Sequence, residues 1–179
     1  MRVRFGGLGG QGVVVSGVIY GHAAMNDDYN VLQSQSYGST TRGGVTSSDV
    51  TLERGEICEL EAPDYDVLVV MCQEALDKYL PKLVDGGLLI TEKSLIDVEP
   101  EDTKNVKHVA IPSIDAAREQ LGRQILANIV SLGSLSQLND AVSKEALETA
   151  ILANVPKGTE QLNKKAFELG AKLAKEATA

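Results

Sequence analysis

A glycine-rich segment near the N-terminus offers the clearest chemistry in this sequence. Gly7, Gly9 and Gly12 satisfy the pattern Gly-x-Gly-x-x-Gly. They lie between a β-prone stretch, 2–6, and a segment that favours a helix, 13–25. Glycines allow a tight turn and bring backbone N–H groups close to a ligand, and a helix N-terminus adds partial positive charge. The segment therefore predicts either a site for phosphate or carboxylate, or a turn that packs closely against another polypeptide.

The sequence that follows argues against a complete dinucleotide site. Such a site needs an acidic residue about 20 residues after the glycines to hold the ribose hydroxyls. Residues 31–35 read Val-Leu-Gln-Ser-Gln and contain no Asp or Glu. The loop also lacks the Gly-Lys-Ser/Thr ending of the phosphate-binding loop in nucleoside triphosphatases. Binding of NAD or FAD is therefore the less favoured interpretation, while the anion site and the packing turn remain equally open.

A second polar segment, 35–44, also combines glycines with side chains that can contact a ligand. Its candidate residues are Gln35, Ser36, Tyr37, Gly38, Arg42, Gly43 and Gly44. The Arg42 guanidinium can form two hydrogen bonds with a carboxylate or phosphate. The alternative interpretation is that Arg42 is an ordinary surface arginine. Both glycine segments follow predicted strands, so we expect them to emerge at one edge of a sheet, where α/β proteins bind ligands.

The rest of the chain shows no catalytic set. It has no Gly-x-Ser-x-Gly elbow and no nucleophile with a matching base. Cys58 and Cys72 are too few for a [4Fe–4S] cluster or a structural zinc, and His22 and His108 share no ligand spacing. We therefore predict no catalytic residue and no metal site in this chain. The loops are expected to serve a site that other polypeptides complete.

Composition narrows the class of partner. The formal net charge is −8 and the pI is about 4.8, so no basic face is available for nucleic acid or for an anionic membrane. No apolar run approaches the roughly 20 residues that cross a bilayer, and the first residues lack the apolar core of a signal peptide. We expect a soluble cytoplasmic protein that binds neither nucleic acid nor membrane.

Apolar patterning predicts the elements that position these loops. We expect strands at 2–6, 29–33, 45–53, 67–71, 88–91 and 106–111, with a hairpin return at 56–60 and a turn at Gly86 and Gly87. We expect helices at 13–25, 74–83, 125–138 and 144–153, a short one capped by Ser113, and a last one capped by Thr159. This order predicts an α/β fold in a single domain, 1–179. The sheet is mainly parallel and Rossmann-like, with helices on both faces and a helical C-terminal third.

At the two glycine segments the sequence resembles the γ subunits of 2-oxoacid:ferredoxin oxidoreductases. The matching residues are Gly7, Leu8, Gly9, Gly10, Gln11 and Gly12, then Gln35, Ser36, Tyr37 and Gly38 with Arg42, Gly43 and Gly44, then Ser48, Asp49 and Val50. Segments 63–68, 128–133 and 163–170 match in the same order, so the resemblance covers nearly the whole chain. It is most similar to 2-oxoglutarate-type members, although residues 39–41 depart from the residues usual there.

The resemblance implies an enzyme that converts a 2-oxoacid and coenzyme A to acyl-CoA, CO2 and reduced ferredoxin. It implies that this chain carries no cofactor, and that thiamine diphosphate, Mg and [4Fe–4S] clusters belong to partner subunits. The implied partners are α and β subunits and, as a further candidate, a δ subunit, with ferredoxin as electron acceptor. A homodimer of the isolated chain is another candidate.

The resemblance also suggests roles for the two loops. Gly7, Gly9, Gly10, Gln11 and Gly12 become candidate cofactor-binding residues, and segment 35–44 becomes a substrate or interface loop facing the thiamine-binding subunits. By this hypothesis Arg42 helps to shape the channel for the oxoacid or coenzyme A. Two other interpretations stay open: a free-standing nucleotide-binding oxidoreductase, and a purely structural assembly module.

Overall fold

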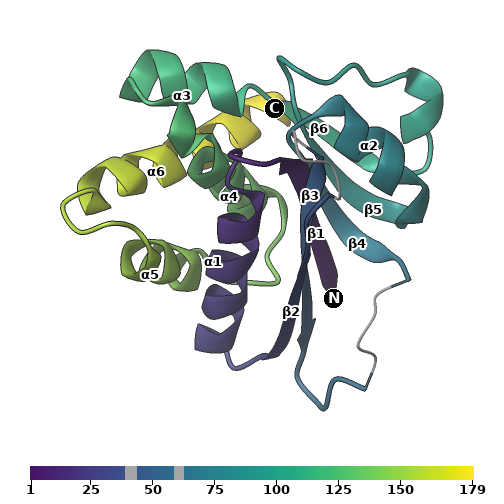
Figure 1. Ribbon diagram of the computed structural model, residues 1–179, viewed down its shortest axis with the longest axis horizontal. Coiled ribbons are helices and arrows are strands. Elements are labelled where there is room, and N and C mark those ends of the chain that lie inside the picture. Colours follow the sequence, from purple (N-terminus) through teal and green to yellow (C-terminus); the bar gives the residue numbers. More distant parts are fainter. Residues whose placement is uncertain (39–43, 59–62) are drawn as a thin grey trace.

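The computed structural model describes residues 1–38, 44–58 and 63–179 and contains one six-stranded sheet flanked by helices (Figure 1). The strand order is β2-β3-β1-β4-β5-β6. The strands are β1 (Arg2–Leu8), β2 (Asn30–Ser36), β3 (Val45–Glu53), β4 (Tyr65–Val70), β5 (Leu83–Glu92) and β6 (Lys107–Ile111). The predicted α/β class is confirmed.

The sheet is mainly parallel, with one strand as the exception. Strands β1, β4, β5 and β6 run parallel, whereas β3 lies antiparallel between β1 and β2. The chain leaves β1 toward the β2–β3 side and then returns to the other side of β1 at β4. Such a reversal leaves a crevice beyond the carboxyl end of the strand, which is where open α/β sheets bind ligands.

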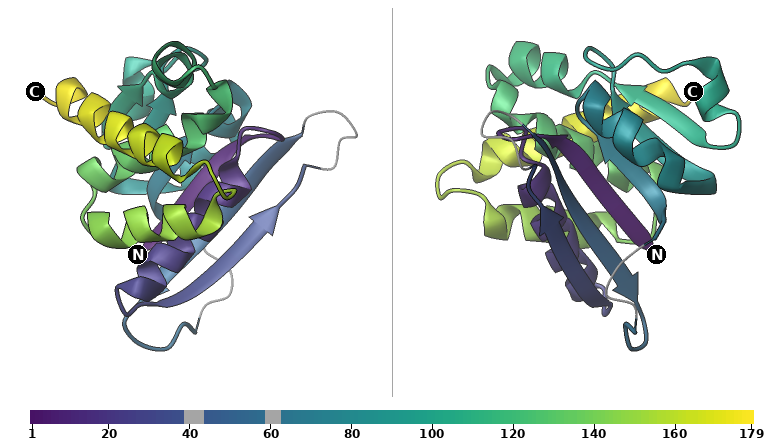
Figure 2. Two further views of the ribbon diagram at one scale, coloured as in Figure 1. Left: turned by 90° about the vertical axis from the view of Figure 1, so that its left-hand side faces the viewer. Right: turned by 45° about the vertical axis from the view of Figure 1, so that its right-hand side comes forward.

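The helices divide unequally between the two faces of the sheet (Figures 1 and 2). They are α1 (Val13–Asn26), α2 (Gln73–Tyr79), α3 (Ser113–Leu121), α4 (Ala127–Leu138), α5 (Lys144–Asn154) and α6 (Glu160–Ala177), with 3-10 turns η1 (Leu80–Lys82), η2 (Pro100–Thr103) and η3 (Gln124–Leu126). Helix α2 covers one face; α1 and the C-terminal helices cover the other. Alternate residues of β4 serve the two cores: Val67 and Val69 face the larger one, and Leu68 and Val70 face the smaller one.

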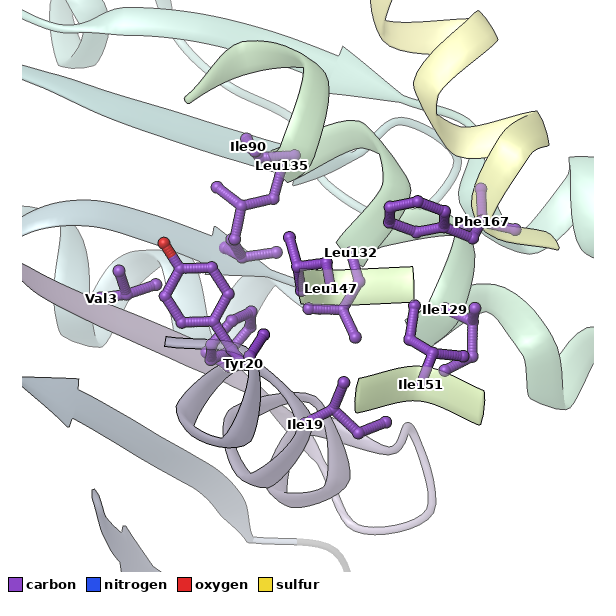
Figure 3. Packing of buried hydrophobic residues seen from close by; sticks show 14 of the residues in the cluster. Val3, Ile19, Tyr20, Ile90, Ile129, Leu132, Leu135, Leu147, Ile151 and Phe167 are labelled. Atoms are coloured by element: carbon purple, nitrogen blue, oxygen red, sulfur yellow. The ribbon is translucent and has the colours of Figure 1, made fainter. Parts of the chain in front are cut away.

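The larger core is aliphatic and joins the N-terminal helix to the C-terminal ones (Figure 3). Phe5 of β1 meets Tyr20 of α1 edge-on, with ring centroids 5.9 Å apart. Glycines bring α1 onto the sheet, because a Cβ on Gly17 would lie 2.0 Å from Ser48 Oγ and one on Gly21 would lie 3.3 Å from Val31 Cγ1. The small-residue face of this helix therefore packs against β2 and β3.

The smaller core holds a paired charge. The Arg4 guanidinium lies against the rings of Tyr65 and Tyr79, 4.3 and 4.5 Å from their centroids. It also donates two hydrogen bonds to the Asp49 carboxylate. Burial raises the pKa of Tyr65 to about 12, while the nearby Arg4 works in the opposite direction. This network ties β1, β3 and β4 together on the face that α2 covers.

Several local predictions were wrong. Residues 56–58 form no strand, and the rest of the expected hairpin return lies outside the described residues. The Gly86-Gly87 turn lies inside β5, which begins at Leu83 because Leu83 already pairs with Tyr65 across an irregularity in the ladder. Ser113 starts α3 without capping it; instead the buried Glu92 carboxylate accepts a hydrogen bond from the Ile114 N–H at 3.0 Å.

Of the two caps predicted for the last two helices, the first is confirmed and the second is wrong. Ser143 caps α5 as predicted, because its Oγ accepts a hydrogen bond from the Ala146 N–H at 3.2 Å. The Asp27 carboxylate in turn accepts from the Ser143 hydroxyl at 2.8 Å. Thr159 precedes α6, but its side chain makes no capping bond to the backbone of that helix.

Helices α4 and α6 touch through two glycines, and this contact gives a stability prediction. A Cβ on Gly133 would lie 2.0 Å from the Phe167 carbonyl oxygen, and one on Gly170 would lie 1.9 Å from that of Val130. Gly133→Ala is therefore expected to lower the free energy of unfolding by about 3 kcal/mol, against the usual helix preference for alanine. Chemical denaturation checks this. Gly55→Ala, which meets nothing within 4 Å, is the control; equal losses in the two variants would contradict the close approach.

Candidate functional site

The glycine loop connects β1 to α1 at the switch point of the sheet. Strand β1 continues through Gly7 to Leu8, so the turn itself spans only 9–12. Gly10 and Gly12 have φ values of 91° and 76°, in the left-handed region that favours glycine. Gly12 precedes α1 and supplies no side-chain cap, so the first N–H groups of that helix stay available.

A cavity of about 630 Å³ opens beside this loop. Its wall combines the glycine loop and the first turn of α1 with Tyr37, Thr46, the start of α4 and the connection from α5 to α6. Most of these residues are apolar, including Val14, Leu126 and Ile129. Apolar pockets with a few convergent polar groups are the usual form of small-molecule sites. The predicted phosphate or carboxylate loop thus forms one wall of a larger site.

Asn128 at the start of α4 is the polar group closest to the loop. It is 8% exposed, and within the described part of the chain its amide has no hydrogen-bond partner. A Cβ on Gly12 would lie 2.7 Å from Asn128 Nδ2, so the amide lies directly against the loop backbone. Among the described residues, no fully buried side-chain nitrogen or oxygen atom lacks a partner, so the Asn128 amide is accessible from the cavity. Its position on the cavity wall suggests that a ligand supplies the missing partner.

Arg123 is the charged residue of this wall. Every other described residue that lines the cavity is uncharged, although the protein as a whole carries a formal charge of −8. The Arg123 side chain is exposed and forms no ion pair with the described residues. Together with the uncapped N-terminus of α1, this guanidinium makes the cavity electropositive in an acidic protein. The chemistry fits an anionic ligand with an apolar body.

Large apolar side chains gather at the mouth of the cavity. Val15, Tyr37 and Ile125 are 48%, 64% and 76% exposed and all three line it. Isolated exposed apolar residues are ordinary, but a group of them around a cavity is typical of an interaction surface. We call this group of three residues the apolar rim.

The second predicted segment lies only partly within the described structure. Ser47 of β3 pairs with both Ser36 of β2 and Gly6 of β1, which confirms that the two glycine segments leave the sheet at the same edge. Gln35 and Ser36 end β2 with exposed side chains. Residues Arg42 and Gly43 lie outside the described residues.

The two described glycines of that segment lie close together. Gly38 and Gly44 approach closely, since a Cβ on Gly38 would lie 2.6 Å from the Gly44 Cα. Among the described residues of the predicted substrate loop, Tyr37 lines the cavity wall.

Gln11 behaves differently from the glycines beside it. Its side chain turns away from the large cavity, its Oε1 accepts a hydrogen bond from the Leu8 N–H at 2.7 Å, and its Nε2 donates to the Met71 carbonyl at 2.9 Å. Both amide groups are thus used inside the chain.

Two observations concern the titratable and sulfur groups of the described structure. Within residues 1–38, 44–58 and 63–179, no three His, Cys, Asp or Glu side chains gather as a metal site would require. Burial raises the pKa of the Cys72 thiol, which disfavours the reactive thiolate. In the same ranges, every helix is too short or too polar to span a bilayer.

Sequence reasoning missed Asn128 and Arg123. Both lie more than 100 positions after the glycine loop, and only tertiary packing brings them to it. Asn128 did carry one signal, as a polar residue in the otherwise apolar stretch 125–130. Arg123 carried none, because a single exposed arginine after a glycine resembles any surface residue.

The fold and the site define a Rossmann-like α/β protein with an uncapped helix N-terminus over a largely apolar cavity. The sequence profile of the pyruvate ferredoxin/flavodoxin oxidoreductase family matches residues 2–173, and the chain belongs to that family. It is 40% identical over 176 residues to the 2-oxoglutarate synthase subunit KorC of Methanocaldococcus jannaschii, covering 98% of this chain and 94% of that one. These findings confirm the resemblance drawn from the two glycine segments.

Solved structures agree on the fold. The γ subunit of a keto/oxoacid ferredoxin oxidoreductase from Geobacter sulfurreducens superposes with a TM-score of 0.88 at 40% identity, covering 98% of this chain and 97% of that one. A 2-oxoglutarate:ferredoxin oxidoreductase from Magnetococcus marinus, solved with 2-oxoglutarate, coenzyme A and succinyl-CoA, matches with a TM-score of 0.86 at 23% identity. There this chain spans 31% of a longer polypeptide, and the likeness concerns the fold.

The unpartnered amide gives a prediction about stability. Asn128→Leu replaces an amide that makes no hydrogen bond within the described residues by an apolar group of similar size, so the free energy of unfolding of the isolated chain should change by less than about 1 kcal/mol. Asn163→Leu is the matched control, because the Asn163 amide donates to Thr159 Oγ1 and to the Thr159 carbonyl, each at 3.0 Å. That control should lose stability. Comparable losses in both variants would show that Asn128 is structural.

Proposed function

We propose that this chain is the γ subunit of a 2-oxoacid:ferredoxin oxidoreductase, with residues 1–179 as one γ-type domain. The complex would convert a 2-oxoacid and coenzyme A to acyl-CoA, CO2 and reduced ferredoxin. The identity to 2-oxoglutarate synthase subunits supports 2-oxoglutarate as the oxoacid: a second relative, from Methanothermobacter thermautotrophicus, is 37% identical over 180 residues and covers 98% of this chain and 95% of that one. The electropositive cavity beside the glycine loop is the observation that carries the proposal.

The cavity suits part of coenzyme A. That molecule carries phosphate groups on a body with apolar portions, and the cavity offers an uncapped helix N-terminus, the Arg123 guanidinium and the Asn128 amide on an aliphatic wall. Phosphates bind at helix N-termini because several N–H groups converge there. We therefore assign the phosphate portion to the glycine loop and Arg123. Arg42 remains a sequence-derived candidate for the same channel.

The apolar rim supplies the contact with other subunits. Val15, Tyr37 and Ile125 surround the entrance, so a partner that covers them would also close the cavity. We assign this face to the α and β subunits that bind thiamine diphosphate and Mg. A δ subunit and ferredoxin complete the expected set of partners.

The iron–sulfur clusters are also assigned to partner subunits, and the complex to the cytoplasm. Two cysteines, one exposed and one buried, fall short of the four thiolates that a [4Fe–4S] cluster takes. What this chain contributes is binding and positioning: it holds anionic groups at the loop, presents an apolar wall, and shields the reacting carbons from water once the rim is covered.

The second candidate function is an assembly module whose cavity binds no small molecule. The apolar rim favours this candidate as much as the first, because it would be needed in either case. The electropositive wall distinguishes them: a pure packing surface does not require an arginine and an amide that is free to bind a ligand on the wall of one cavity. A free-standing nucleotide-binding oxidoreductase is the third, and it would hold a redox cofactor in the isolated chain.

Replacing Arg123 in the reconstituted complex tests the proposal. Loss of one charge-assisted contact to phosphate should raise the apparent KM for coenzyme A about fivefold, with kcat and the KM for the oxoacid nearly unchanged. Arg118→Ala is the matched control: Arg118 lies on α3 and pairs with Asp115 at 2.7 Å, away from the cavity wall. Steady-state kinetics against coenzyme A measures both variants.

The two readouts separate the candidate functions. An Arg123→Ala complex that assembles normally and keeps the wild-type KM for coenzyme A contradicts the proposed site. Loss of assembly with normal kinetics in the remaining complex favours the assembly module. A tightly held flavin or nicotinamide in the purified chain favours the free-standing oxidoreductase.

A further inference from the structure

The Gln11 side chain closes the glycine loop onto the neighbouring strand. Its Oε1 accepts from the Leu8 N–H at 2.7 Å, at the point where β1 ends, and its Nε2 donates to the Met71 carbonyl at 2.9 Å, just beyond β4. A backbone bond from the Gln11 N–H to the Leu8 carbonyl, 3.1 Å long, completes the turn. One side chain therefore fastens the loop both to its own strand and to the adjacent one.

The bonding pattern requires an amide. The Leu8 N–H is a donor and needs an acceptor, whereas the Met71 carbonyl is an acceptor and needs a donor. Glutamine supplies both at this length. Glutamate would retain the acceptor and lose the donor, and methionine, of similar size, would lose both.

Gly7 makes room for this arrangement. A Cβ at that position would lie 2.6 Å from Gln11 Oε1 and 2.9 Å from Val13 Cγ1. By contrast, a Cβ on Gly9 would meet nothing within 4 Å. The first glycine of the motif is thus explained by the side chain of Gln11, and not by the approach of a ligand.

Gln11 does not belong to the wall of the large cavity. It lines a small void behind the loop, with Ser16, Met71 and Asn128 among its neighbours, while Gly9, Gly10 and Gly12 line the large one. Gln11 therefore acts on a bound ligand through its neighbours, and its hydrogen bonds fasten the loop backbone. Glycine-rich turns are intrinsically mobile, so fixing this one reduces the conformational entropy that binding would otherwise remove.

We propose that Gln11 is a positioning residue: by fastening the loop to β1 and β4, it holds the N–H groups at the start of α1 in the orientation that receives the phosphates of coenzyme A. This inference rests on the proposed function. By this inference, Gln11 does not contact the cofactor itself but acts through its neighbours. Gly7 has the same indirect role.

Two variants and one matched control test the inference. Gln11→Met removes both side-chain bonds and Gln11→Glu removes the one to Met71. Gln73→Met is the control, because the Gln73 amide also makes two bonds, to the Asp77 carboxylate and the Asp97 N–H, each at 2.9 Å, but on α2 at the other face of the sheet. Hydrogen exchange of the Leu8 amide in the isolated chain reports the fastening, and kinetics of the reconstituted complex reports its consequence.

We expect the Leu8 amide to exchange about tenfold faster in Gln11→Met, and to stay protected in Gln11→Glu and Gln73→Met. Both Gln11 variants should raise the apparent KM for coenzyme A by about tenfold with kcat within about twofold, while Gln73→Met leaves that KM unchanged. The stability loss common to Gln11→Met and Gln73→Met cannot produce this difference.

The outcomes that overturn the inference are distinct from failure of the proposed function. Unchanged Leu8 exchange in Gln11→Met overturns the fastening itself. Faster exchange with an unchanged KM for coenzyme A overturns the positioning role. A wild-type complex whose turnover does not depend on coenzyme A overturns the proposed function, and this is seen before any variant is compared.

Discussion

Close backbone contact at the glycine loop constrains every other part of the site. A side chain at Gly12 would collide with the Asn128 amide, and a side chain at Gly7 with that of Gln11. Because these two positions lack a Cβ, the ends of β1 and β4 pack closely against the starts of α1 and α4. The uncapped N-terminus of α1 therefore faces the cavity in a fixed direction.

Several groups of the site add little to the stability of this chain, and the chain alone provides no binding partner for them. An amide without a hydrogen-bond partner on the cavity wall, an unpaired guanidinium and an apolar rim each contribute little to the stability of an isolated protein. They occur around one cavity, at the edge where the strand order reverses. Such features are expected where a ligand and a partner complete the structure. The same residues thus give a chain with a well-packed core a surface that a ligand and a partner can complete.

Local patterns predicted much of this fold, and tertiary contacts account for the remainder. Strand 45–53 and the buried helix that includes α4 follow from apolar patterning, and the motif at Gly7 to Gly12 located the loop. The antiparallel placement of β3 escaped prediction, although the lack of a helix between β2 and β3 is the signal for it. Strand β5 runs through Gly86 as an irregularity in its ladder with β4, where Gly86 keeps a left-handed φ of 78°. Arg123 could not be predicted and Asn128 carried only a weak signal, since only packing of the C-terminal helices brings them to the loop.

The central claim is that the loop edge and the apolar rim form a docking surface for thiamine-dependent subunits. Purifying the tagged chain from its native cell, followed by assay of thiamine diphosphate and hydrogen exchange of segments 9–15 and 123–129, tests it most directly. We predict that thiamine diphosphate co-purifies with the chain, and that both segments exchange more slowly in the complex than in the isolated chain. Native material without thiamine diphosphate, or a complex in which both segments exchange as fast as in the free chain, would contradict it.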